Sequence, residues 1–393
     1  MRKNAVITGM GLLTPFGQGI EAFLDAIKGS DSCFTKSAPS SDSIEDAFDV
    51  KAQLCGKIDR WNFVQPRYMN FRKYSQLHRF QQWLFIACAD ALQDSGLKRF
   101  FKKTDRIGII NASDLYHLYS LENLESQQMV EKNTPASISN ILALYLRING
   151  PTFSIAAGEC SGLVAVGQAF ELIRNDRCDI VVVICGTQLN NSIRCGYEEL
   201  GYISIPPHEC LKPFDEERNG TILSEGAGCI IVEARESAVR REIDIYGEIM
   251  GYAISCKHNT AGPAIQSSMQ QSLHDAEITP ANVDFICASA NGNIELDRSE
   301  REALNYLFDA NIPVSGIKSM TGETLHASGV INTIAGLLSI NEGFIPATIN
   351  CHPVDGCLNI AGHRRDAAIE TALINSISYN GVSATLLLKK CDN

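Results

Sequence analysis

One cysteine lies where its thiol could act as a nucleophile. Cys160 stands at the junction between an expected strand, Phe153–Ala157, and an expected helix, Gly162–Arg174. Free amides and the positive dipole end at a helix start favour the thiolate form of a cysteine. The small residues Gly158 and Ser161 would let a substrate approach it. The pattern is typical of a nucleophile, yet cysteines in apolar segments are more often small buried hydrophobes, and the segment alone leaves both interpretations open.

Residue spacing supports no other chemistry. The eight histidines contain no HxxxH pair, and His274 with Glu277 has no second histidine nearby, so no metal site is predicted. Gly9 and Gly11 follow a strand, but the third glycine of a dinucleotide site is missing, which makes a tight turn the expected role. No serine lies in an acyl-hydrolase turn.

Length and composition indicate a globular chain with two core-bearing units. The 393 residues are 45% hydrophobic, and a net charge of −11 argues against nucleic acid as a partner. No apolar run approaches the ~20 residues of a membrane span. Fourteen cysteines without a CxxC pair indicate a reducing compartment, so we expect a cytoplasmic protein. The stretch from Arg60 to Cys88 is basic and has no acidic residue, which fits either a solvated face or a dock for an acidic partner.

Short apolar strands alternate with amphipathic helices along both halves of the chain. This order predicts α/β layers with largely parallel pairing and a boundary within a charged run at Ala234–Glu242. The expected strands are Asn4–Thr8, Arg106–Ile110, Phe153–Ala157, Asp179–Cys185, Ile245–Tyr252, Phe285–Ala288, Ile312–Ser315, Ile374–Ile377 and Ala384–Lys389. The expected helices are Ile20–Lys28, Gln81–Gln93, Ile138–Leu146, Gly162–Arg174, Ala264–Asp275, Arg298–Phe308 and Val330–Ile340.

A series of motifs along nearly the whole chain resembles the β-ketoacyl synthases. Besides the cysteine turn, these motifs are Val6–Gly11, Gly150–Pro151, Pro213–Gly220, Glu225–Gly228, Val283–Ile286, Lys318–Gly322 and Pro346–Asn350. The resemblance implies an α/β thiolase-like fold with two similar βαβ-rich halves in a five-layer αβαβα arrangement. It also implies a dimer and acyl thioesters delivered on the phosphopantetheine of an acyl carrier protein. The expected halves are residues 1–238, carrying Cys160, and 239–393, carrying Ser289, Lys318 and Glu323.

Both catalytic histidines of that family are replaced in this chain. Matching the motifs places Ser289 and Glu323 at the two histidine positions, while Glu300 and Lys318 fall on the positions that support those histidines. The histidines donate hydrogen bonds to the thioester oxygen of a malonyl unit as it loses carbon dioxide. A serine can donate one such bond, but an ionised glutamate only accepts. Autonomous condensation is therefore not expected, unless burial protonates Glu323 or His326 moves in; a packed, hydrogen-bonded role is the favoured interpretation of His326.

Further positions follow from the resemblance. The amides of Cys160 and Tyr379 would form an oxyanion hole, and the family's Phe-Gly-Phe-Gly-Gly-Thr gate becomes Ile377–Val382, which keeps one flexible glycine at Gly381. His258 would line the pocket or support the fold. Glu159 stands where the family usually has a small residue, and it could raise the pKa of the thiol or pair across a subunit interface.

The altered site leaves several functions open. The leading hypothesis is a chain-length factor of a type II polyketide synthase that pairs with an active ketosynthase, although such factors commonly lack the cysteine. The alternatives are an atypical Cys-Ser-Glu ketosynthase, acyltransferase or cyclase that uses Cys160, with Glu323 as a general base, or a carrier-binding scaffold without chemistry. Partners are a ketosynthase subunit or a second copy, together with the acyl carrier protein; no bound cofactor is expected.

Overall fold

The computed structural model describes residues 2–37, 49–62, 74–75, 77–97, 105–113, 135–257, 261–352 and 358–391. In this part of the chain, a 12-stranded mixed sheet runs in the order β13-β11-β10-β15-β16-β9-β1-β8-β7-β5-β6, with β2 paired to β1. Its strands are β1 (Ala5–Thr14), β2 (Gly17–Gln18), β5 (Ile107–Asn111), β6 (Thr152–Ser154), β7 (Ile180–Thr187), β8 (Gly226–Ala234), β9 (Gly247–Cys256), β10 (Phe285–Cys287), β11 (Pro313–Ser315), β13 (Asn359–Ile360), β15 (Thr371–Ile377) and β16 (Val382–Lys389). Two short ribbons pair β3 (Thr35–Lys36) with β4 (Leu54–Cys55) and β12 (Phe344–Ile345) with β14 (Arg365–Asp366).

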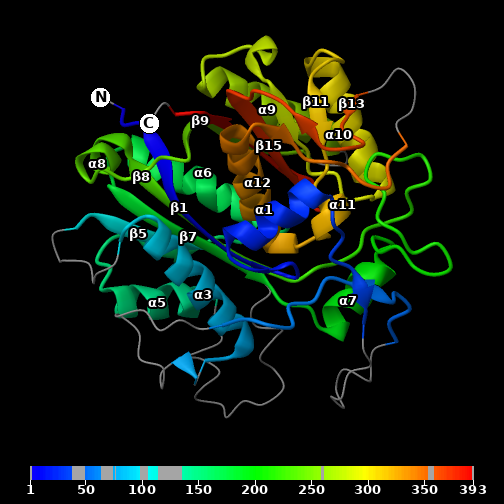
Figure 1. Cartoon of the computed structure of the whole chain (residues 1–393), viewed down its shortest axis with the longest axis horizontal. Coiled ribbons are helices and arrows are strands. Elements are labelled where there is room, and N and C mark those ends of the chain that lie inside the picture. The colour runs from blue at the N-terminus through cyan, green and yellow to red at the C-terminus, as the bar shows by residue number, and fades with distance from the viewer. Residues whose placement is uncertain are drawn as a thin grey trace.

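The helices cover the sheet on both faces and fill the space between its two halves (Figure 1). They are α1 (Ile20–Gly29), α3 (Arg79–Asp94), α5 (Pro135–Leu146), α6 (Ser161–Arg174), α7 (Asn191–Glu199), α8 (Arg235–Arg240), α9 (Ala261–Asp275), α10 (Ile294–Leu307), α11 (Lys318–Thr321) and α12 (Ser328–Glu342), with short 3₁₀ turns η3 (Pro280–Asn282) and η4 (Leu325–Ala327). None of these helices is long and apolar enough to cross a membrane.

The core shows five layers. Helices α3 and α5 share one apolar cluster with β5, β7 and β8, and helices α9 and α10 share another with β10 and β15. Between them, α6 and α12 lie in a central cluster with strands of both halves. Strand β7 shows how the layers arise, because Val181 and Val183 enter the central cluster while Ile180 and Val182 enter the outer one. The αβαβα order expected from the resemblance is therefore present.

The prediction of largely parallel pairing was wrong at the centre of the sheet. Parallel pairing joins β5 to both β6 and β7, β10 to both β11 and β15, and β11 to β13. At the centre, β1 pairs antiparallel with both β8 and β9. Strand β8 also pairs antiparallel with β7. The sequence prediction contained no strand there and used Glu225–Gly228 only as a family motif, although all nine residues of β8 are buried.

The two glycines near the N-terminus do not form the predicted turn. Gly9 and Gly11 lie inside β1, which is fully buried. A Cβ atom at Gly9 would lie 2.4 Å from the carbonyl oxygen of Ala91, and one at Gly11 would lie 2.0 Å from that of Ala87, both in α3. These glycines therefore let the backbone of α3 pack directly on the strand, which is a structural and not a phosphate-binding role.

Replacing Gly11 by Ala is expected to destabilise the protein by about 1–3 kcal/mol, because the added methyl group would overlap the α3 backbone. Urea denaturation followed by circular dichroism measures the change. Gly362→Ala is the matched control, since a Cβ there meets no atom within 4 Å, and it should shift the free energy of unfolding by less than about 0.5 kcal/mol. Equal effects of the two substitutions would contradict the close packing of α3 on β1.

Candidate active site

Cys160 caps the start of α6 and is completely buried. Its Sγ atom donates a hydrogen bond to the carbonyl oxygen of Ser376 at 3.2 Å and lies 3.4 Å from that of Val382. The pKa of the thiol is raised to about 12, chiefly by burial; the hydrogen bond to Ser376 opposes this rise, the charge of Glu159 adds to it and the charge of Lys318 opposes it. In this conformation Cys160 has the burial of a small core residue, and its use as a nucleophile stays a prediction.

The predicted oxyanion hole is partly engaged within the chain. The amide of Cys160 donates to the carbonyl oxygen of Ala157 at 3.2 Å, and the amide of Gly381 donates to that of Ser378 at 3.1 Å. Tyr379 stands at the surface with 44% of its area exposed. The role of the Cys160 and Tyr379 amides stays a prediction, and it requires the Cys160 amide to exchange its present acceptor for a substrate oxygen.

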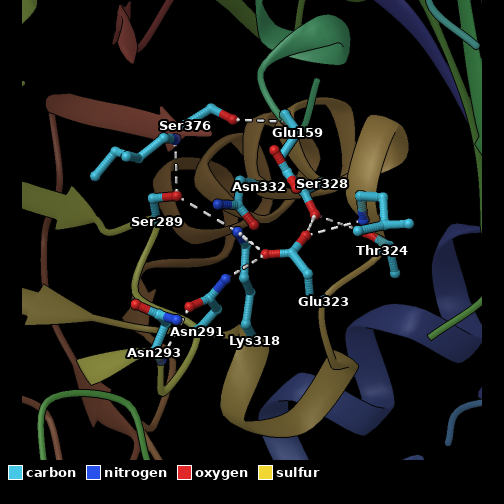
Figure 2. A network of polar contacts seen from close by, with 12 residues as sticks. Glu159, Ser289, Asn291, Asn293, Lys318, Glu323, Thr324, Ser328, Asn332 and Ser376 are labelled. Carbon is cyan, nitrogen blue, oxygen red and sulfur yellow. Dashed lines mark hydrogen bonds and ion pairs between the residues drawn. The ribbon is translucent and has the colours of Figure 1, made fainter. Parts of the chain in front are cut away.

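Glu323 lies at the centre of a buried polar network (Figure 2). Its Oε2 atom accepts from Lys318 Nζ at 2.7 Å and from Asn291 Nδ2 at 2.8 Å. Its Oε1 atom accepts from the amide of Leu325 at 2.9 Å and from the hydroxyl of Ser328. Four donors surround the two oxygens, which is the pattern that stabilises an ionised carboxylate and leaves no lone pair to take a proton from a substrate.

Ser289 and Lys318 join this network to the end of β15. Ser289 Oγ accepts from the amide of Ile377 at 2.9 Å, and Lys318 Nζ lies 3.4 Å from the same oxygen. Lys318 is 1% exposed, so its salt bridge with Glu323 is a buried one. With two donors on its oxygen, Ser289 keeps only its hydroxyl proton for a substrate.

The carboxyl group of Glu300 binds the backbone at Ser289. Its Oε1 atom accepts from the amide of Ser289 at 2.9 Å and from Asn375 Nδ2 at 3.0 Å. Its Oε2 atom has no hydrogen-bond partner among the described residues. Burial raises the pKa of this carboxyl group to about 7, nearby Asp297 adds to the rise, and the donated hydrogen bonds and Lys318 oppose it.

A Glu300→Gln variant should become progressively more stable than the native protein as the pH rises from about 5 to 8. A carboxyl group with a raised pKa in the folded state stabilises the fold while protonated, and this contribution is lost as the pH rises through that pKa of about 7. The gain at pH 8 is at most about 3 kcal/mol. Thermal melting of both proteins between pH 5 and 8 tests it; a constant difference in melting temperature would contradict a titrating Glu300.

The other predicted residues are distributed around this centre. His326 is buried and its Nδ1 lies 3.1 Å from the carbonyl oxygen of Gly158, as the packed interpretation expected. Glu159 pairs inside the chain, accepting from the hydroxyl of Tyr197 at 2.7 Å. His258 lies outside the described residues. Among the described residues, no cluster of three or more His, Cys, Asp or Glu side chains could hold a metal ion.

The basic stretch from Arg60 to Arg79 is only partly described. Arg67, Arg72 and Lys73 lie outside the described residues. The guanidinium of Arg79 stacks on two tryptophan rings, 5.0 Å from the centroid of Trp61 and 4.9 Å from that of Trp83. It also donates to the carbonyl oxygen of Ile58. Arg79 therefore has intramolecular partners, and a dock for an acidic partner would depend on its neighbours.

Comparisons with known proteins decide the family. The model of the β-ketoacyl synthase N-terminal domain matches residues 2–238, and that of the C-terminal domain matches residues 246–352. The chain belongs to the β-ketoacyl synthase family. It is 27% identical to a 3-oxoacyl-[acyl-carrier-protein] synthase 2 of Synechocystis, an alignment that covers 99% of this chain and 98% of the relative.

Solved structures confirm the thiolase-like ketosynthase fold. The ishigamide ketosynthase/chain length factor superposes with a TM-score of 0.83 at 22% identity and covers 100% of both chains. A type II polyketide synthase ketosynthase, solved with its acyl-carrier protein and bound to the hexaketide, gives a TM-score of 0.86 at 24% identity, again over 100% of both chains.

In this site Lys318 is paired with Glu323. The motif resemblance places Glu323 at a histidine position of the family, and that placement stays a prediction. Removing one donor to a developing oxyanion typically costs ~100- to 1,000-fold in rate. The site can still offer the Ser289 hydroxyl, whereas Glu323 offers only acceptors that are already occupied.

Sequence reasoning missed several residues that shape the site. Asn291 and Ser328 bind Glu323, and Tyr197 and Ser378 bind Glu159. The resemblance places Ser378 at a glycine of the family's gate motif and Glu159 at a position that is usually small. These two substitutions could therefore have been recognised together in the sequence. Tyr197 carried no such signal, since α7 comes next to Glu159 only through the fold.

Proposed function

We propose that this chain is a non-condensing subunit of the chain-length-factor type. It pairs with an active ketosynthase and shapes the tunnel in which a carrier-bound polyketide chain grows. The observation that carries the proposal is the carboxylate of Glu323, which is surrounded by four donors at a position where condensing relatives have a histidine. The similarity to the ishigamide ketosynthase/chain length factor supports the same role.

The sheet edge next to the cysteine turn supports a subunit partner. Strand β6 is the last strand of the sheet in the described part of the chain, and it pairs on one side only, with β5. An edge strand presents unpaired backbone groups that a strand of another chain can bind. Because β6 leads into the turn that carries Cys160, a partner bound there would lie beside the site.

Acyl groups would reach such a pair on the phosphopantetheine of an acyl carrier protein. The solved ketosynthase that contains its acyl-carrier protein supports this partner. A cavity of about 910 Å³ opens next to the gate, lined by Lys257, Arg298, Tyr379 and Gly381 among others. Its lining is mixed, since Glu295 and Glu302 also border the cavity and Arg298 pairs with Glu295, so it offers polar groups of both charges to a partner that arrives at the gate.

The retained cysteine favours a second candidate, an acyltransferase, cyclase or atypical ketosynthase that works through Cys160. A thiol at a helix start fits such chemistry if the site opens. Intact mass after incubation with acyl-loaded carrier protein tests it, since acylation of Cys160 adds the mass of the acyl group. A Cys160→Ala variant that retains full product formation in the pathway would exclude this candidate.

The leading proposal is tested by co-expression with a ketosynthase encoded beside this chain. We expect a stable heterodimer on size exclusion and product formation that needs both subunits. Within the heterodimer, Cys160→Ala should change product formation less than twofold, whereas alanine at the ketosynthase's own nucleophile should abolish it. A homodimer that ignores such ketosynthases would contradict the proposal.

A further inference from the structure

The segment of residues 376–382, here called the gate segment, closes over Cys160. It connects the end of β15 to the start of β16, and its turn is held by hydrogen bonds from the Ser378 amide to the Val382 carbonyl at 2.8 Å and from the Gly381 amide to the Ser378 carbonyl at 3.1 Å. The thiol of Cys160 lies beneath this turn, donating to the carbonyl oxygen of Ser376. The gate segment thus covers the thiol with its own backbone.

Glu159 ties the gate segment to the cysteine turn and to α7. Its carboxylate accepts from the hydroxyl of Ser378 and, at 2.7 Å, from the hydroxyl of Tyr197. Its carbonyl oxygen accepts from the hydroxyl of Ser376 at 3.1 Å, the contact visible in Figure 2. The side chain is 4% exposed. A single residue therefore binds the β15 end of the gate segment, at Ser376 and Ser378, and also α7.

Three tyrosine rings cover these hydrogen bonds. Tyr379 of the gate segment packs edge-on against Tyr197 and Tyr202, with ring centroids 6.0 and 5.5 Å away, and Tyr197 and Tyr202 are 6.4 Å apart. Tyr202 and Tyr379 line the cavity of about 910 Å³, whereas neither Glu159 nor Cys160 does. The rings therefore separate the outer cavity from the thiol and exclude water from the Glu159 contacts.

The backbone conformation at Gly158 makes room for the contact between Ser378 and Glu159. Gly158 has φ of 57°, and a Cβ there would lie 2.4 Å from Ser378 Oγ. Its carbonyl oxygen accepts from the amide of Ser161 at 3.0 Å and from its hydroxyl at 2.6 Å. The turn before α6 is thus fixed in a form that lets Ser378 reach Glu159. By the motif resemblance, Glu159 and Ser378 each stand where the family has a small residue, so the two substitutions are consistent with a contact between them.

We propose that Glu159, through Ser378 and Tyr197, holds the gate segment shut over Cys160, so that this thiol stays unreactive until those hydrogen bonds are broken. The negative charge one residue away acts in the same direction, since it raises the pKa of the thiol beyond the effect of burial. Glu159 is a positioning residue in this account. The proposal concerns the chain by itself and does not depend on the identity of its partner.

Alkylation of the native protein by iodoacetamide at pH 8 tests the proposal, with rates resolved for each cysteine by peptide mass spectrometry. In the native chain, Cys160 should react as slowly as Cys185, which is equally buried in the same core. In Glu159→Ala, we expect the Cys160 rate to rise at least tenfold while the Cys185 rate stays unchanged. Glu159→Gln, which keeps an acceptor oxygen but no charge, should give an intermediate rate.

Two smaller variants keep the test valid if Glu159→Ala fails to fold. Ser378→Ala and Tyr197→Phe each remove one donor to Glu159, and each should accelerate Cys160 severalfold. Glu171→Ala is the matched control, because this carboxylate lies on α6 and pairs with Arg174 away from the gate. The proposal is overturned if no gate variant changes the Cys160 rate by more than twofold, if Cys185 accelerates equally, or if Glu171→Ala has the same effect.

Discussion

A Lys318→Met variant should lose about 3–5 kcal/mol of stability, because it leaves the Glu323 carboxylate buried without its cation. Both side chains are almost fully buried and their charged atoms are 2.7 Å apart. The remaining donors, Asn291, Ser328 and the Leu325 amide, still bind the carboxylate but carry no charge to balance it. Urea denaturation of the purified variant measures the free energy of unfolding.

Two comparisons separate the ion pair from other effects of the substitution. A Lys318→Met, Glu323→Met double variant removes both charges, and it should recover most of the loss because hydrophobic replacement of a buried pair is often close to neutral. Lys28→Met is the matched control, since Lys28 pairs with Glu342 at the surface and should cost less than about 1 kcal/mol. If Lys318→Met costs no more than Lys28→Met, Glu323 is not held as a buried anion.

The sequence predicted most of the elements because their periodicity reflects the layers. The expected helix Gly162–Arg174 is α6, one residue longer, and the expected strand Asp179–Cys185 is β7. Strand β8 is as fully buried as β7, which was predicted, but it was missed because it begins with Gly226, Ala227 and Gly228, which are residues uncommon in strands. The division of the chain at residue 238 stays a prediction.

The sequence predicted which residues form the candidate site, but not that the Cys160 thiol is buried. Motif order placed Cys160, Ser289, Lys318 and Glu323 together, and the structure links the last three by hydrogen bonds and a salt bridge. Local sequence suggested a thiolate at the helix start, whereas the state of the thiol depends on strands β15 and β16, more than 200 positions later in the chain. Burial by distant segments cannot be derived from the turn alone.

The hydrogen-bond partners of Glu159 and Glu323 also could not be derived from the sequence alone. In one of the alternative hypotheses Glu323 acts as a general base, but Asn291, from the loop before α10, and Ser328, from α12, bind its oxygens. Glu159 looked unpaired or intermolecular, and α7 supplies Tyr197. Whether a buried carboxyl group is ionised depends on the hydrogen-bond donors and charges around it. Its state can therefore be judged only when the fold shows these neighbours.

The isolated chain should decarboxylate malonyl-loaded carrier protein at least ~100-fold more slowly than a ketosynthase that has both histidines. Ser289 can still donate one hydrogen bond to the developing enolate, but the donor at Glu323 is missing, and one such donor typically contributes ~100- to 1,000-fold. The salt bridge to Lys318 balances the charge of Glu323, so the deficit arises from the missing donated hydrogen bond and not from repulsion alone. Release of carbon dioxide, measured with the carrier in excess, gives the rate.

Decarboxylation is the decisive readout because it does not require acylation of Cys160. Ser289 Oγ accepts from the amide of Ile377, which belongs to the gate segment, so the gate segment must open before a malonyl unit can reach the site. Decarboxylation is therefore also measured in Glu159→Ala, where a rate that stays low reports on Ser289 and Glu323 themselves. A rate in Glu159→Ala within about 10-fold of the ketosynthase would mean that the site has a second donor after all, and it would remove the basis for a non-condensing role.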